Sequence, residues 1–219
     1  MKRIHVVLAT ALVGLLSAAP ATAQEGGSIF LGLAAGGSYS GLRGDFVSDP
    51  DVQRNYKWGF AGGATFEAFV KRNAFSIKVE ALYTQKGTGG IPQGLNNVDL
   101  NLAYIEVPVM LNGSVPLSYK WTVAFYTGIS VGFNLSCDLK SSDGSSISCS
   151  DSEDVDPKST DIGWPFGLGI AYWPSGRTGN YLSFDVRYVY GISNAFEDSV
   201  GNISNQVLEL LVRYAFKMK

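Results

Sequence analysis

Carboxylates in regularly alternating segments are the residues of this sequence that could do acid–base chemistry, and Glu80 and Glu106 are the candidate pair. Two carboxylates can act as general acid and general base only if both lie within reach of the reacting groups, and the sequence does not determine the distance between them. Hydrolases commonly add a histidine base, but His5 is the only histidine and lies in an N-terminal segment that we expect to be removed. We therefore expect no catalytic residue, no cofactor and no metal ion.

The charged residues sit in segments with a strict period of two. Residues 182–190 place apolar side chains on one parity, and Ser183, Asp185 and Arg187 on the other. Residues 207–216 repeat this pattern. Successive side chains point to opposite faces of a strand, so these segments are predicted to be strands with two unlike faces.

The length of these strands indicates what surrounds them. About ten tilted residues span the hydrocarbon core of a bilayer. An arginine facing lipid near the midplane costs about 2–4 kcal/mol, so the charged parity should face inward. Lys57 belongs to this inward set. The remaining members are predicted to form a charge network in the lumen: Glu67, Lys78, Glu80, Glu106, Asp185, Arg187, Glu209 and Arg213. Within this network we expect the ion pairs Asp185–Arg213 and Arg187–Glu209.

The N-terminus has the features of a signal peptide: a basic start, an apolar run from Val6 to Leu16 and a small-residue cleavage site at residues 21–23. We expect residues 1–23 to be cleaved and residues 24–219 to form one domain. The sequence contains no apolar run of 18 or more residues, so no membrane helix is predicted. A closed barrel is then the structure that can span the membrane. The chain is mildly acidic and has no basic cluster, so we expect no nucleic-acid partner.

The predicted fold is all-β: a closed, antiparallel, up-and-down transmembrane barrel of eight strands. Its connections alternate between long surface loops and short periplasmic turns. The four long loops are at residues 38–55, 85–99, 136–160 and 191–205. The three short turns are at residues 71–73, 113–119 and 174–180. Aromatic residues near the strand ends are predicted to form girdles at the two membrane interfaces: Trp58, Trp121, Trp164, Trp173, Tyr214 and Phe216.

The third long loop contains both cysteines of the chain. Cys137 and Cys149 are close in sequence and belong to an exported protein, so we expect a disulfide between them. The same segment is rich in carboxylates, at positions Asp138, Asp143, Asp151, Glu153, Asp154, Asp156 and Asp161. Their spacing fits no calcium-binding loop, and we expect them to be solvated.

Several stretches resemble the PorT-like family of small outer-membrane β-barrels. They are Tyr83-Thr84-Gln85-Lys86-Gly87, Leu102-Ala103-Tyr104-Ile105-Glu106-Val107-Pro108, Pro165-Phe166-Gly167-Leu168-Gly169 and Arg187-Tyr188-Val189-Tyr190-Gly191-Ile192. The resemblance covers nearly all of the mature chain. It implies a place in the bacterial outer membrane and, for most members, no assigned chemistry.

The function expected from these features is structural, anchoring or surface-interacting. Partners would be outer-membrane lipid, the outer-membrane assembly machinery and a surface or periplasmic protein. A narrow small-solute channel is the first alternative, because inward glycines could leave room in the lumen. A soluble, lipocalin-like ligand-binding barrel is the second, and it would turn the apolar parity inward.

Overall fold

A computed structural model describes most of the chain, namely residues 27–44, 55–71, 74–93, 96–141, 144–149, 157–176, 179–196 and 203–218. The expected signal peptide and the acidic positions 143 and 151–156 lie outside these ranges. Among the described residues, no helix is long and apolar enough to cross a membrane.

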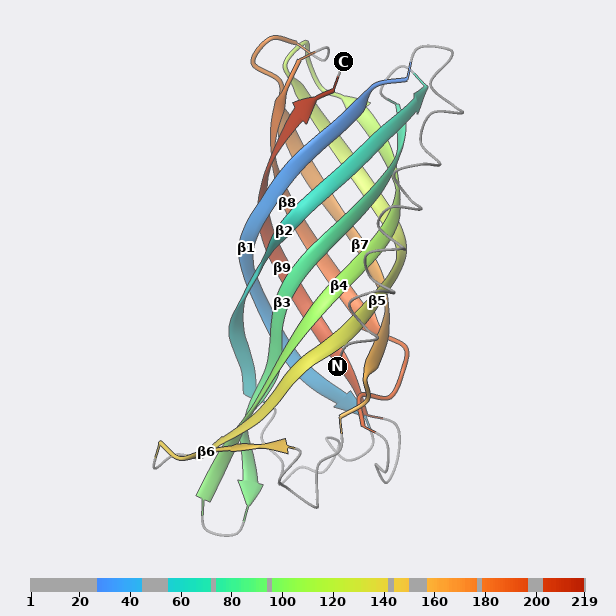
Figure 1. Cartoon of the computed structure of the whole chain (residues 1–219). Helices are drawn as coiled ribbons and strands as arrows, with labels where there is room; N and C mark the ends of the chain where they lie inside the picture. Colours follow the sequence, from blue (N-terminus) through green and yellow to red (C-terminus); the bar gives the residue numbers. More distant parts are fainter. Residues whose placement is uncertain are drawn as a thin grey trace.

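The described residues form one antiparallel sheet (Figure 1). Its strands are β1 (Ile29–Gly44), β2 (Asn55–Lys71), β3 (Phe75–Gln93), β4 (Asn96–Pro116), β5 (Trp121–Ser141), β6 (Ser146–Ser148), β7 (Thr160–Tyr172), β8 (Tyr181–Gly191) and β9 (Ile203–Lys217). The strand order is β4-β3-β2-β1-β9-β8-β7-β5-β6, and a further pairing joins β4 at one end of this order to β5. Eight strands therefore form a ring, and β6 pairs only onto β5.

The ring has unlike ends. The connections after β2, β4 and β7 are short, and they lie at the end where the start of β1 pairs with the end of β9, through Phe30 and Lys217. We call this the short-turn end. The opposite end is the long-loop end (Figure 1). It contains β6, the longer connections after β1, β6 and β8, and the short connection between β3 and β4.

The strands are longer than the sequence pattern predicted, and the predicted count of eight omitted β6. The expected loop at residues 85–99 is mostly strand, because β3 continues to Gln93 and β4 begins at Asn96. Likewise β5 continues to Ser141. Polar and glycine residues in these outer parts interrupt the apolar alternation while their backbones still pair. Gly90 adopts a φ of 68°, in the left-handed region that favours glycine, within an irregularity of the β3–β4 pairing.

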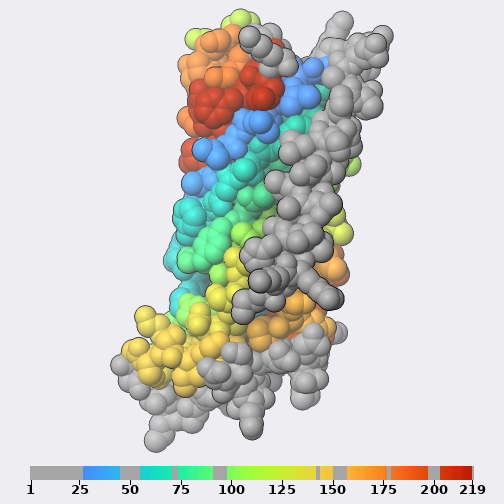
Figure 2. All heavy atoms as spheres, in the orientation of Figure 1, coloured from blue at the N-terminus to red at the C-terminus, as the bar shows by residue number. Residues whose placement is uncertain are grey.

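The outer surface of the ring is apolar. Leu33 and Leu111 are each 65% exposed and Phe125 is 58% exposed, whereas Lys78 and Glu80, which lie on the inward parity of β3, are 1% exposed. Figure 2 shows the side chains of β1, β2 and β3 in oblique bands against one another on the outside. Fully burying one such apolar side chain is worth about 1.5–3 kcal/mol, so this surface requires an apolar solvent. Except for Lys57, the charged residues that the sequence predicted to face inward are buried, and the apolar parity faces outward as predicted.

Part of the sheet extends past the ring at the long-loop end. The pairing of β5 with β7 stops at Phe133, whereas its pairing with β4 continues to Ser141. The irregular β3–β4 pairing likewise continues to Gln93, beyond the last β2 partner of β3, which is Gly89. We call this extension, formed by the outer parts of β3, β4 and β5 together with β6, the overhang.

Candidate functional site in the lumen

Two arginines and three carboxylates form the centre of the lumen. Arg187 Nη1 lies 2.7 Å from Glu80 Oε2, and its Nε lies 2.7 Å from Glu209 Oε2. Arg213 Nη2 lies 3.0 Å from Glu80 Oε1 and 3.2 Å from Asp185 Oδ2. All five side chains are buried. Glu80 therefore bridges the two arginines from the other side of the lumen.

Strand register accounts for this arrangement. In the β8–β9 pairing, Arg187 is directly opposite Glu209, and Arg213 is opposite Ser183, two residues from Asp185. Directly opposed and diagonal side chains on one face of a sheet lie close enough for long side chains to meet. The two ion pairs expected from the sequence are those that the register brings together. Glu80 belongs to β3, and its contact with both arginines could not be read from neighbouring strands.

Lys78 is less tightly held than the arginines. Its Nζ lies 3.8 Å from Glu80 Oε1 and 3.8 Å from Asp185 Oδ1, which is beyond hydrogen-bonding distance for both. The ammonium also lies 4.1 Å from the centre of the Tyr126 ring. This ring contact is a cation–π interaction, which partly stabilises a charge without hydrating it.

A second group of buried charges lies nearer the long-loop end. Lys86 Nζ lies 2.6 Å from Glu106 Oε1 and 2.9 Å from Asp161 Oδ2. Asn205 Nδ2 donates a hydrogen bond of 2.9 Å to Asp161 Oδ2, and Ser193 Oγ donates one to Oδ1. We call Lys86, Glu106 and Asp161 the lysine triad.

Of the lysine triad, only Glu106 was among the charges predicted from the sequence to face the lumen. Lys86 was placed in a loop, and Asp161 was expected to be solvated, yet both are buried. The inward parity of Lys78, Glu80 and Thr84 continues to Lys86, so extending the alternation past Thr84 would have found it. Lys57 was expected to face inward, but its side chain is 29% exposed and pairs at 2.9 Å with Asp99 near the long-loop end.

Glu67 departs from the expected ionic network. Within the described chain it has no salt-bridge partner and instead accepts hydrogen bonds from three neutral donors: Ser76, Asn112 at 2.8 Å and Tyr181. Ser76 and Asn112 are paired positions on β3 and β4, while Tyr181 begins β8 on the other side of the lumen. Lys78 is the position directly opposite Glu67 in the β2–β3 register, but the two side chains form no ion pair, and hydrogen bonds from the neutral donors satisfy the buried carboxylate instead.

The expected girdle residues lie outside the ring with one exception. Trp58, Trp121 and Trp164 are 63%, 43% and 51% exposed, and Tyr214 and Phe216 are 40% and 48% exposed. These values suit side chains that face lipid at the membrane interfaces.

Trp173 was predicted wrongly as a girdle residue. It is 2% exposed and packs inside the ring. Its ring centre lies 4.5 Å from that of Tyr181, 5.7 Å from that of Phe30 and 6.4 Å from that of Phe69. Trp173 directly follows β7 and continues the inward parity of Gly169 and Ala171, so extending the alternation by one parity step would have placed it in the lumen. We call these four side chains the aromatic floor, because they fill the lumen at the short-turn end.

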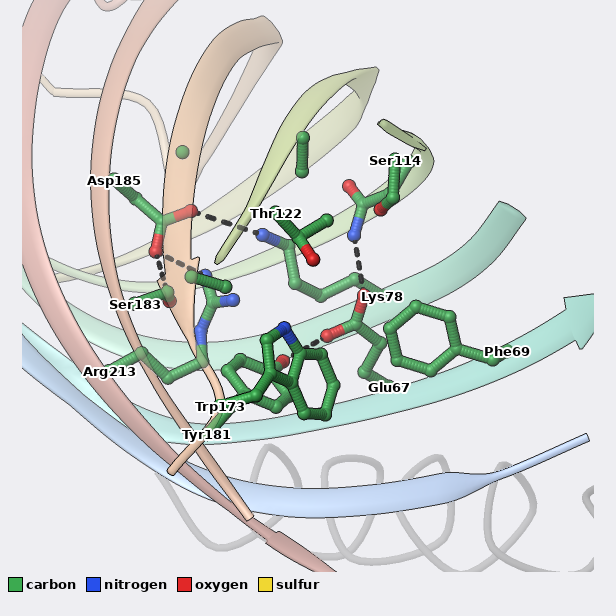
Figure 3. A pocket seen from close by; sticks show the side chains of 14 residues that line it. Glu67, Phe69, Lys78, Ser114, Thr122, Trp173, Tyr181, Ser183, Asp185 and Arg213 are labelled. Atoms are coloured by element: carbon green, nitrogen blue, oxygen red, sulfur yellow. Dashed lines mark hydrogen bonds and ion pairs between the residues drawn. The ribbon is translucent and has the colours of Figure 1, made fainter. Parts of the chain in front are cut away.

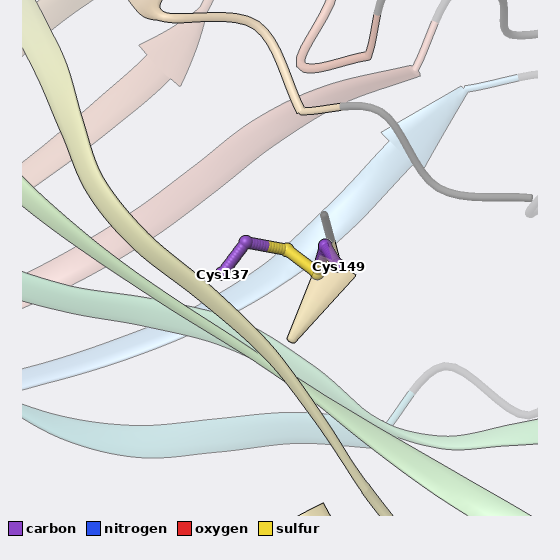
Figure 4. Close-up of a disulfide and its surroundings, with 2 residues drawn as sticks. All are labelled: Cys137 and Cys149. Atoms are coloured by element: carbon purple, nitrogen blue, oxygen red, sulfur yellow. A yellow bond between two sulfur atoms is a disulfide. The ribbon is translucent and has the colours of Figure 1, made fainter. Parts of the chain in front are cut away.

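The long-loop end of the lumen is filled by apolar side chains and a disulfide. Cys137 and Cys149 are bonded, which confirms the predicted pair, and their Cα atoms lie 5.4 Å apart (Figure 4). Cys137 lies within β5 and not in a loop, because β5 is longer than expected. The disulfide is buried in a cluster that we call the apolar cap, made of Leu42, Leu100, Leu102, Tyr104, Cys137, Cys149, Ala195, Phe196 and Ile203.

Comparison with known families identifies the kind of domain. The model of a family described as outer membrane protein beta-barrel domain matches residues 22–197. The chain belongs to this family. Membership assigns the barrel domain to the bacterial outer membrane, and it agrees with the apolar outer surface of the ring. The match does not distinguish the PorT-like group, which stays a prediction.

Solved structures with a similar backbone are distant in sequence. Neisserial surface protein A (NspA) is 15% identical, with a TM-score of 0.48 over 86% of this chain and 98% of that chain. OprG from Pseudomonas aeruginosa is 12% identical, with a TM-score of 0.47 over 88% and 96%. Ail of Yersinia pestis, in complex with the heparin analogue sucrose octasulfate, is 12% identical, with a TM-score of 0.44 over 86% and 99%. A comparison with curated protein sequences finds no match.

Proposed function

We propose that residues 24–219 form a closed, eight-stranded transmembrane barrel without a steady pore, which has a structural, anchoring or surface-interacting role in the outer membrane. In this proposal the signal peptide at residues 1–23 is cleaved, and the outer-membrane assembly machinery inserts the chain. The pairing of β4 with β5 supports closure of the barrel. Closure pairs the backbone throughout, which a spanning sheet requires in lipid.

The observation that carries the proposal is that buried side chains fill the lumen in successive layers. Following β3 from its start, the inward residues pass the aromatic floor, the central ion pairs at Lys78 and Glu80, and Leu82. They then reach the lysine triad at Lys86, and the apolar cap lies beyond it. Leu82 packs in a thin apolar layer between the two charged groups, with Ala34, Ala61 and Leu211. Eight strands enclose a space that side chains can fill, and these layers are of that kind.

The channel alternative depends on space beside the inward glycines, and their surroundings argue against it. A Cβ atom on Gly167 would lie 2.9 Å from the Tyr126 hydroxyl, and one on Gly169 would lie 2.6 Å from Asp185 Oδ1. These glycines allow other atoms to approach the backbone closely, which is a common reason for glycine in a strand.

Electrical recording tests the proposal. The purified protein, reconstituted in planar lipid bilayers, is expected to give no steady single-channel steps, while a general porin in the same lipids gives them. A stable, large conductance from the unmutated protein would show that the lumen is open and that the channel alternative is correct.

The surface-interacting role needs a separate experiment. We expect chemical crosslinking on intact cells to join the barrel domain to an envelope or surface protein through its long-loop end. A chain shortened within the overhang should lose that crosslink while still migrating as a folded barrel in unheated gel samples. Recovery of the protein in the soluble fraction without detergent would contradict the membrane location and favour the lipocalin-like alternative.

A further inference from the structure

A small cavity, lined by both charged and apolar side chains, lies in the lumen between the aromatic floor and the central ion pairs. Its volume is about 30 Å³. Charged residues of both signs line it, with Asp185 and Arg213 on one side and Glu67 and Lys78 on the other, and Trp173 and Tyr181 border it from the floor (Figure 3). A cavity needs a volume of about 10–15 Å³ to hold one water molecule, so this cavity has room for about two.

Three buried polar atoms belong to residues that line this cavity and have no hydrogen-bond partner among the described protein atoms. They are Trp173 Nε1, Thr122 Oγ1 and Asn112 Oδ1, on residues that are 2%, 5% and 4% exposed. Figure 3 shows Thr122 and Trp173 near the Lys78 side chain among the residues that line the cavity. An unsatisfied buried polar atom costs about 1–3 kcal/mol, so three around one cavity indicate a small polar occupant.

The long contacts of Lys78 point to the same occupant. An ammonium has three donors, but both carboxylate oxygens near Lys78 Nζ lie at 3.8 Å. Two polar atoms separated by more than 3.5 Å are commonly bridged by a water molecule. Water can also accept a hydrogen bond from the Trp173 indole and donate one to Asn112 Oδ1. A monovalent cation could accept no hydrogen bond from the indole.

We propose that this cavity is a built hydration site that holds about two water molecules and links the indole of Trp173 and the hydroxyl of Thr122 to the Lys78 ammonium. The site lies at the short-turn end only, and the layer around Leu82 separates it from the lysine triad. The hydration site does not depend on the proposed function, because a dead-end water site is compatible with any role of the barrel.

Nuclear magnetic resonance of the ¹⁵N-labelled protein in detergent micelles tests the hydration site. The indole proton of Trp173, assigned with Trp173→Phe, is expected to show a magnetisation-transfer peak to water. Thr122→Val removes one hydrogen-bonding group at nearly constant shape and should abolish or weaken this peak, whereas Thr122→Ser should retain it. Absence of the peak in the unmutated protein would overturn the proposal.

Crystallography distinguishes water from a cation. Crystals grown in rubidium chloride are expected to show two ordered waters within hydrogen-bonding distance of Trp173 Nε1 and Thr122 Oγ1, and no anomalous scattering in the cavity. A rubidium peak there would overturn hydration in favour of a monovalent cation site. A dry cavity would overturn the proposal, whatever the bilayer recordings give.

Discussion

Arg187 lies directly opposite Glu209 in the β8–β9 register, and its Nε donates a hydrogen bond of 2.7 Å to Glu209 Oε2. The same guanidinium donates through Nη1 to Glu80 on β3, so one side chain joins two walls of the lumen. Breaking a buried ion pair leaves the other charge uncompensated, which makes this contact a sensitive point of the barrel.

Of the residues in the central ion pairs, Glu80 should be the one whose loss lowers the stability of the protein most. Glu80→Gln removes the charge that both arginines share and is expected to lower the free energy of unfolding by about 3–5 kcal/mol. The matched control is Asp99→Asn, because Asp99 pairs with Lys57 while its side chain is 44% exposed, and such pairs contribute about 0–1 kcal/mol. Denaturant unfolding in detergent micelles measures both. Equal effects would contradict the central role of Glu80.

A double-mutant cycle can isolate the Arg187–Glu209 contact. Arg187→Met and Glu209→Gln should each destabilise the barrel, and the double variant should be more stable than the sum of their effects predicts. Directly interacting residues give coupling energies of about 0.5–3 kcal/mol. Additive effects in the same unfolding assay would mean that the two side chains act independently.

The disulfide should matter more for the apolar cap than for the barrel. Closing a loop with a sequence separation of 12 residues is worth about 3 kcal/mol in chain-entropy estimates. We expect Cys137→Ala combined with Cys149→Ala to accelerate hydrogen exchange at the outer end of β5 while the unheated gel shift remains. Alkylation without reductant, followed by mass spectrometry, should find no free thiol in the unmutated protein, and two labelled cysteines would contradict the bond.

The aromatic floor predicts different consequences for two tryptophans. Trp173→Ala removes a buried ring from the lumen and is expected to cost about 3–5 kcal/mol. Trp121→Ala removes a ring that is 43% exposed on the outside, so it should cost less. Thermal unfolding followed by circular dichroism compares the two variants. A greater loss for Trp121→Ala would contradict the interior position of Trp173.

The exposed pair at the long-loop end predicts a small effect of pH. The hydrogen bond from Lys57 holds the pKa of Asp99 below its usual value near 3.8. A carboxyl whose pKa is depressed by folding stabilises the protein above its unfolded pKa, and this contribution disappears as pH falls through the folded pKa. A titration of Asp99 by nuclear magnetic resonance should therefore give a pKa below that of Asp99 in a Lys57→Ala variant. Identical values would contradict the interaction.

The sequence was sufficient for features that depend on the parity of strands. Alternation determined which side chains of β8 and β9 face inward, and adjacency of those strands determined the pairs of Arg187 and Arg213. Contacts across the lumen, such as those of Glu80, depend on how eight strands meet around the ring, and no local pattern contains that information. Trp173 shares the inward parity of Gly169 and Ala171, and its girdle prediction was wrong because it relied on the location of Trp173 at a strand end instead of on that parity.

The overhang has a consequence for how this protein can change. The central ion pairs lie within the ring, whereas β5 continues for several residues after its last pairing with β7 at Phe133. Substitutions on the outer parts of β3, β4 and β6 that leave the apolar cap intact therefore alter what other molecules meet at that end without touching the central ion pairs. With the proposed surface-interacting role, recognition and stability would rest on different residues of this chain and could be selected separately.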